Sequence, residues 1–117
     1  MIGANGIGTE ALKNLILPGV GFVTILDNKL VDEEDLKSNF FLTPESVGKP
    51  RHSETLKYLL ELNPDVKGQS SEESLSEDNI KNFTLVIATE LNDFEMRSVG
   101  RICESAEVPV IYLRTYG

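Results

Sequence analysis

Three glycines near the N-terminus form a candidate phosphate-binding turn. Gly3, Gly6 and Gly8 stand in the segment Gly3-Ala4-Asn5-Gly6-Ile7-Gly8, directly before a stretch with helical spacing of apolar residues. Backbone N–H groups of such a turn, together with the N-terminus of the following helix, can bind a phosphate. Asp27 follows the next apolar run about 20 residues further on, where a carboxylate would accept hydrogen bonds from ribose hydroxyls. The alternative is that the glycines only form a tight turn that lets a helix pack on a strand.

A nucleotide at this turn would fit either of two enzyme classes, a dinucleotide-dependent oxidoreductase or an enzyme that adenylates its substrate. The dehydrogenase fingerprint has glycine at the third place of the turn, so that the backbone closely approaches the pyrophosphate. Asn5 occupies that place here, and its side chain would crowd the pyrophosphate. Asp27 and Asn39 could also do no more than cap turns, as short polar side chains often do.

The elements that would position these residues alternate between strands and helices. Apolar spacing and turn residues predict helices over residues 9–17, 43–62 and 94–106, and strands over residues 22–26, 83–89 and 108–113, with a weak strand at Val66. The acidic run at residues 32–35 is predicted to be a solvated loop or a single helical turn, and residues 69–82 a surface loop. This alternation predicts an α/β, Rossmann-like, doubly wound fold with a mainly parallel sheet flanked by helices. A first strand should precede Gly3, yet only Met1 and Ile2 are present, so we expect a piece of a longer protein.

Composition excludes several functional classes. The chain has 117 residues, enough for one domain, and a net charge of −8 from 19 acidic and 11 basic residues. That sign argues against nucleic-acid and anionic-membrane binding, and no apolar run approaches the ~20 residues of a membrane span. The single cysteine, Cys103, excludes an internal disulfide and favours a reducing compartment, the cytoplasm or nucleus. Cys103 is expected to be buried and His52 to lie on the surface, and no spacing of ligands predicts a metal site.

Three motifs in this order resemble one known family. The glycine turn with Asp27 is followed by Ser38-Asn39-Phe40-Phe41-Leu42 and by Val47-Gly48-Lys49-Pro50-Arg51. Together they resemble the adenylation domain of ubiquitin-activating-type enzymes and of their bacterial relatives in molybdopterin and thiamin synthesis. The resemblance covers residues 1–117, as part of a larger adenylation domain. Within this family, residues 8–15, 38–42 and 114–117 are similar to the regulatory, non-catalytic subunit of the heterodimeric activating enzyme of the neddylation pathway.

Departures from the pattern of active members imply a vestigial nucleotide site. Active members carry an arginine where this chain has Leu42, a lysine where it has Arg51, and a Mg²⁺-binding aspartate where it has Leu91. Leucine cannot neutralise a phosphate or bind a hard cation, and arginine does not reproduce the compact charge of lysine. Asn5 also replaces a glycine of the phosphate loop. The retained and altered positions of this site are Gly3, Asn5, Gly6, Gly8, Asp27, Asn39, Leu42, Arg51 and Leu91.

The resemblance implies a subunit that has no catalytic residues of its own. Its partner subunit would bind ATP and Mg²⁺ and adenylate the C-terminus of a ubiquitin-like modifier, and this chain would bind no cofactor. Phe40 and Phe41, which replace polar and basic residues, are candidate contacts with that partner. The alternatives are an active nucleotide-binding enzyme, either a sulfur-carrier adenylyltransferase or an NAD-type dehydrogenase, and the corresponding subunit of the SUMO-activating enzyme.

Overall fold

The computed structural model describes residues 1–114, so the end of the 114–117 motif lies outside the described residues. The helices and strands are α1 (Gly6–Ile16), β1 (Phe22–Leu26), α2 (Glu33–Ser38), α3 (Arg51–Leu60), β2 (Lys67–Ser71), β3 (Val86–Thr89), α4 (Asp93–Ser105) and β4 (Val110–Leu113). Two 3₁₀ turns, η1 (Pro44–Ser46) and η2 (Ile80–Asn82), lie in the connections. No helix within residues 1–114 is long and apolar enough to cross a membrane.

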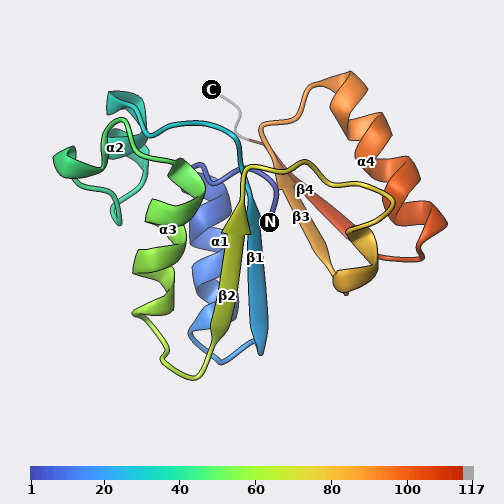
Figure 1. Ribbon diagram of the computed structural model, residues 1–117, viewed down its shortest axis with the longest axis horizontal. Coiled ribbons are helices and arrows are strands. Elements are labelled where there is room, and N and C mark those ends of the chain that lie inside the picture. Colours follow the sequence, from blue (N-terminus) through green and yellow to red (C-terminus); the bar gives the residue numbers. More distant parts are fainter. Residues whose placement is uncertain (115–117) are drawn as a thin grey trace.

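All strand pairs are parallel, which confirms the predicted α/β class. β1 pairs with β2, and β3 pairs with β4. The N-terminal residues connect the two pairs, because Ile2 forms parallel bridges to both Leu26 and Ala88. Figure 1 shows the two strand pairs with the N-terminus between them.

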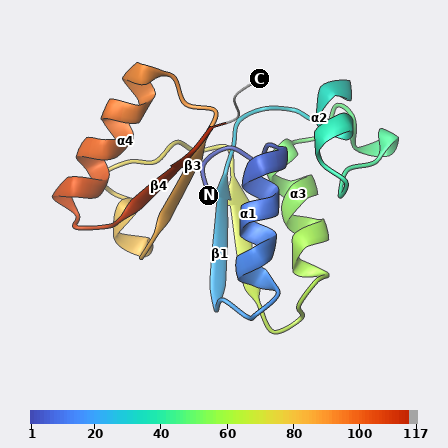
Figure 2. The same cartoon turned by 180° about the vertical axis from the view of Figure 1, so that it is seen from behind.

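Helices cover both faces of this sheet, as in a doubly wound fold. One apolar cluster joins α1 and α3 to β1, and it includes Met1. A second cluster joins α4 and η2 to β3, and it includes Ile2. Because successive residues of an extended segment point to opposite faces, the two clusters lie on opposite faces. The view from behind shows α1 and α3 beside β1, and α4 beside β3 and β4 (Figure 2).

The helix predicted over residues 43–62 is wrong in its first half. η1 ends at Ser46, and α3 begins only at Arg51. Gly48 between them has a φ of +88°, outside the helical region, and the residue before Pro50 is biased away from helix by the proline ring. The chain therefore turns here, and Arg51 becomes the first residue of a new helix.

The acidic run is not a loop but forms the short helix α2, which is close to the predicted single helical turn. α2 has a capping box, in which the Asp32 side chain accepts from the Asp35 N–H at 2.9 Å and the Asp35 side chain accepts from the Asp32 N–H at 3.0 Å. Asp35 is buried, not solvated. Residues 69–71, predicted as loop, belong to β2, whereas Val66 precedes that strand and packs in the core.

Candidate functional site

The glycines of the N-terminal turn are required by close packing. Gly3 has a φ of +83°, and a Cβ there would collide with the Thr89 hydroxyl. A Cβ at Gly6 would collide with the Ser38 carbonyl, and one at Gly8 would lie 3.0 Å from the Gly3 carbonyl oxygen. The Thr89 hydroxyl completes the contact by donating to the Gly3 carbonyl at 2.9 Å. Packing of the turn on β3 and α2 is thus sufficient reason for glycine at all three positions.

The N-terminus of α1 is already capped. Asn5 is the N-cap, and its side-chain oxygen accepts from the Gly8 N–H at 2.9 Å. The Ala4 N–H donates to Asp27 Oδ2 at 2.6 Å. The Gly8 N–H is one of the groups that a phosphate at a helix N-terminus would need, and here the Asn5 side chain accepts from it instead.

Asp27 lies at the carboxyl end of β1 and is buried. Besides the Ala4 N–H, its carboxylate accepts from the Lys29 N–H at 2.8 Å and from Arg51 Nε at 2.7 Å. A ribose hydroxyl would have to compete with a charged hydrogen bond and two backbone donors. The geometry therefore favours a structural role for Asp27.

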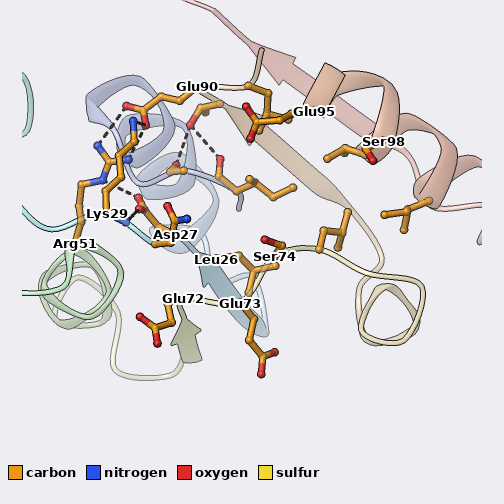
Figure 3. Close-up of a pocket in the computed structure, with 18 of the residues that line it drawn as sticks. Leu26, Asp27, Lys29, Arg51, Glu72, Glu73, Ser74, Glu90, Glu95 and Ser98 are labelled. Atoms are coloured by element: carbon orange, nitrogen blue, oxygen red, sulfur yellow. Dashed lines mark hydrogen bonds and ion pairs between the residues drawn. The ribbon is translucent and has the colours of Figure 1, made fainter. Parts of the chain in front are cut away.

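Arg51 is enclosed by three carboxylates and is only 3% exposed. Its Nε contacts Asp27, its Nη1 contacts Asp35 at 3.0 Å, and its Nη2 contacts Glu90 at 2.7 Å. Lys29 Nζ adds a second contact to Glu90 at 3.1 Å. Figure 3 shows Asp27, Lys29, Arg51 and Glu90 joined by hydrogen bonds and ion pairs. We call these four residues and Asp35 the Arg51 network.

In this network, hydrogen bonds and ion pairs together shift the pKa values of Arg51 and Glu90 more than burial does. Burial by itself would lower the pKa of the Arg51 guanidinium, but hydrogen bonds and charge from Glu90 and Asp27 raise that pKa above its ordinary value. Burial would raise the pKa of Glu90, yet Arg51 and then Lys29 hold it below its usual range. Arg51 is therefore fully charged and fully paired, and it has no charge left over for a triphosphate.

Asn39 and Leu42 also face inward. The Asn39 amide donates to Thr9 Oγ1 at 3.1 Å, and its oxygen accepts from the Phe41 N–H at 3.1 Å. Leu42 is buried at 6% exposure. Asn39 thus caps its turn and ties it to α1, and Leu42 is part of the protein interior.

A pocket of about 270 Å³ lies at the carboxyl ends of β1 and β3, where a doubly wound fold binds its ligand. Leu91 lines this pocket beside Glu90. The charged residues of its lining are five carboxylates and two cations, namely Asp27, Glu72, Glu73, Glu90, Glu95, Lys29 and Arg51. Both cations are paired with carboxylates of the lining, so the lining carries a net negative charge. Within residues 1–114 no group of three His, Cys, Asp or Glu side chains is arranged to hold a metal ion.

Two members of the network were missed from the sequence. Glu90 directly follows β3, and a carboxylate directly after a parallel strand is itself a signal, because strand ends meet at one edge of the sheet. Asp35 could have been found from the spacing Asp32-x-x-Asp35, which is typical of a capping box.

The remaining candidates differ in exposure. Phe40 is 90% exposed, whereas Phe41 packs against the core cluster of α1 and α3. Phe41 therefore contributes to the fold, and Phe40 has the more exposed ring of the two candidate partner contacts. Cys103 is buried, as expected, and burial raises the pKa of its thiol. His52 is half-buried, with Nδ1 2.7 Å from Ser70 Oγ.

Comparisons with known proteins agree with this geometry. The sequence profile of the ThiF family matches residues 1–117. The chain is 40% identical to the NEDD8-activating enzyme E1 regulatory subunit of Xenopus laevis, over all of this chain and 23% of that protein. It is 41% identical to the corresponding subunit AXL of Arabidopsis thaliana, over 94% of this chain and 22% of that protein. SUMO-activating enzyme subunit 1 of Dictyostelium discoideum is 32% identical, over 99% of this chain and 36% of that protein.

A solved structure shows the same fold. E. coli MccB, crystallised with succinimide, superposes with a TM-score of 0.81 at 20% identity, over 95% of this chain and 34% of that chain. The present chain spans only about a quarter of the length of the regulatory subunits that it matches. The profile match over the whole sequence, the parallel α/β architecture and the glycine turn at the carboxyl edge of the sheet together show that the chain belongs to the ThiF family.

Proposed function

We propose that this chain is part of the non-catalytic, regulatory subunit of a heterodimeric activating enzyme for a ubiquitin-like modifier, in the neddylation pathway. The partner subunit would bind ATP and Mg²⁺ and adenylate the C-terminus of the modifier. The observation that carries the proposal is the Arg51 network, in which an arginine and three carboxylates take up the groups that would contact a nucleotide. The identity to NEDD8-activating regulatory subunits supports the choice of pathway.

The chain alone is expected to show no adenylation activity. Formation of an acyl-adenylate depends on positioning and on neutralising the triphosphate charge, and the pocket supplies neither a free cation nor a metal site among the described residues. The measurement is ATP–pyrophosphate exchange with modifier, ATP and Mg²⁺, with an intact heterodimeric activating enzyme as the positive control. Exchange within about tenfold of that control would contradict the proposal, since loss of such groups costs about 2.7–4 kcal/mol each.

The same assays test the alternatives. Exchange with a sulfur-carrier protein would indicate an active adenylyltransferase, and binding of NAD would indicate a dehydrogenase. Preferential co-purification with a SUMO-activating catalytic subunit would move the chain to that pathway.

Phe40 is expected to contribute to binding of the catalytic partner. Phe40 stands in the motif at residues 38–42, where the active members that the chain resembles have polar and basic residues, and its ring is 90% exposed. Phe40→Asp should therefore weaken co-purification with the catalytic subunit by at least about tenfold, the effect of losing an interface hot spot. Phe94 on α4, 77% exposed, provides a matched control, and Phe94→Asp should leave co-purification unchanged. Equal effects of both substitutions, or no effect of Phe40→Asp, would remove Phe40 from the interface. Circular dichroism should show native folding for both variants.

A further inference from the structure

The connection between β2 and η2 is an acidic surface segment that contains free hydroxyl groups. Residues 72–79, which we call the acidic loop, include four exposed carboxylates and no basic side chain. None of these carboxylates forms an ion pair within residues 1–114. Figure 3 shows Glu72, Glu73 and Ser74 beside the pocket that they help to line. The loop is therefore open to a partner with a basic surface.

The serine and threonine side chains of the sequence differ in the residue that stands three positions later. Only three of them are followed at that distance by a carboxylate, and the pairs are Thr24 with Asp27, Ser70 with Glu73, and Ser74 with Glu77. Protein kinases with a basic substrate groove select such acceptors, because lysine and arginine side chains of the groove bind the downstream carboxylate. The tertiary structure distinguishes between these three hydroxyls.

Two of the three hydroxyls lie in paired strands. Thr24 belongs to β1, and its Oγ1 accepts from Gln69 Nε2 at 3.5 Å. Ser70 belongs to β2, and its Oγ lies 2.7 Å from Nδ1 of His52. β1 and β2 pair along their whole lengths. A kinase binds its substrate as an accessible extended segment, so either hydroxyl could reach an active site only after the two strands separate.

Ser74 is accessible without such a separation. It is exposed and lies outside the described helices and strands, and its hydroxyl has no hydrogen-bond partner in the part of the chain that the structure describes. Its neighbours Ser71 and Ser76 use their Oγ atoms to accept from backbone N–H groups, at 3.0 Å and 3.2 Å. The Ser74 carbonyl accepts from Asn79 Nδ2 at 3.0 Å, which ties the loop to its own turn. Ser74 thus presents a free hydroxyl to solvent, with Glu77 three residues downstream.

We propose that Ser74 is a phosphorylation site for a protein kinase with a basic substrate groove, and that ATP is the phosphoryl donor. Oγ of Ser74 attacks the γ-phosphorus of ATP, the bond from that phosphorus to the oxygen bridging to the β-phosphate breaks, and ADP leaves. The hydroxyl proton passes to the catalytic carboxylate of the kinase. Glu77 binds the basic groove, and Asp78 adds a second negative charge beside it.

The phosphate on Ser74 remains exposed and does not reorder the loop. A phosphoserine carries about −1.5 to −2 charges at pH 7 and orders a segment when an arginine or lysine is close enough to pair with it. The acidic loop has no basic residue. The added charge instead joins that of Glu72 and Glu73 in the lining of the pocket. Phosphorylation therefore makes this face of the molecule more anionic and leaves the fold unchanged.

The test uses the 117-residue chain, whose native fold is checked by circular dichroism, with ATP, Mg²⁺ and a purified acidophilic kinase of the casein-kinase class. Mass spectrometry locates the phosphate and measures the rate of its incorporation. A synthetic peptide of residues 64–81 serves as the unfolded reference, in which Ser70 and Ser74 are both accessible. The comparison separates the effect of the fold from that of the local sequence.

In the folded chain the phosphate is expected on Ser74, and incorporation at Ser70 should be at least about tenfold slower than in the peptide, because the strand must first open. Glu77→Gln should slow the reaction at Ser74 by at least about tenfold, since it removes the charged contact with the groove. Glu73→Gln removes the same charge on the other side of Ser74, and it should change the rate by less than about threefold. Ser74→Ala should abolish incorporation, and Ser105→Ala, at an exposed serine of α4, should leave it unchanged.

Three results would overturn the assignment. They are incorporation at Ser70 in the folded chain at the rate of the peptide, a reaction slowed by Glu73→Gln and not by Glu77→Gln, and absence of phosphate at Ser74. The melting temperature of the phosphorylated chain should stay within about 4 °C of that of the unmodified chain, as for other changes at exposed positions. A larger decrease would show that the Ser74 hydroxyl is packed against the protein and would also contradict the proposal.

Discussion

Arg51→Met is expected to lower the free energy of unfolding by about 3–5 kcal/mol, the usual cost of removing one partner from a buried ion network. Asp27 and Asp35 are buried beside the guanidinium, and the Glu90 side chain is 27% exposed. Without Arg51, their negative charges face one another with only Lys29 near Glu90. Urea denaturation at neutral pH measures the loss.

Two controls separate this effect from a general loss of positive charge. Arg101→Met removes an exposed arginine from α4 and should change the free energy of unfolding by less than about 0.5 kcal/mol. Adding Asp27→Asn and Glu90→Gln to Arg51→Met should recover part of the loss, because the uncompensated charges disappear. A loss below about 1 kcal/mol for Arg51→Met would mean that water, and not Arg51, solvates the carboxylates.

The Arg51 network also makes the folding stability of the chain decrease at acid pH. The pKa of Glu90 is lower in the folded chain than in the unfolded chain, so the unfolded chain binds more protons as the pH falls. The contribution of Glu90 to stability is therefore complete above its unfolded pKa, near 4.3, and is lost as the pH falls through the lower, folded value.

Gly3→Ala is expected to cost about 2–5 kcal/mol, the sum of left-handed backbone strain and overpacking. The position has a φ of +83°, and the new methyl group would collide with the Thr89 hydroxyl and lie 2.9 Å from the Thr89 carbonyl oxygen. Thr89 is fixed by its own hydrogen bonds to residues 2 and 3, so it cannot move away easily. The midpoint of thermal unfolding measures the effect.

Gly48→Ala is the matched control for this substitution. Its φ of +88° imposes similar backbone strain, but no atom lies within 4 Å of the position of a Cβ. The expected cost is therefore about 1–2 kcal/mol, from strain alone. Equal losses at Gly3 and Gly48 would show that the turn does not depend on its contact with Thr89.

Local patterns determined most of the secondary structure. The apolar, β-branched run of β1 and the spacing of apolar residues in α1 and α4 are visible in the sequence, because strand and helix periodicity follow from neighbouring residues. The predicted helix boundaries are wrong where two helix-start signals follow each other closely in the sequence. Pro44 starts a 3₁₀ turn and Pro50 precedes α3, so one predicted helix became two elements.

From the resemblance, the sequence by itself also predicts altered positions of a nucleotide site, Asn5, Leu42, Arg51 and Leu91, since these are differences of residue type at recognisable motifs. It could not show which contacts Arg51 makes. Arg51 meets Asp27 across 24 residues and Glu90 across 39. Those contacts exist only because β1 and β3 are parallel and end at one edge of the sheet, where α3 begins with Arg51. Whether Arg51 is a free phosphate ligand or the centre of a closed ion network was therefore decided by tertiary structure, because the energy of a buried charge depends on the distance and burial of its partners and not on its neighbours in the chain.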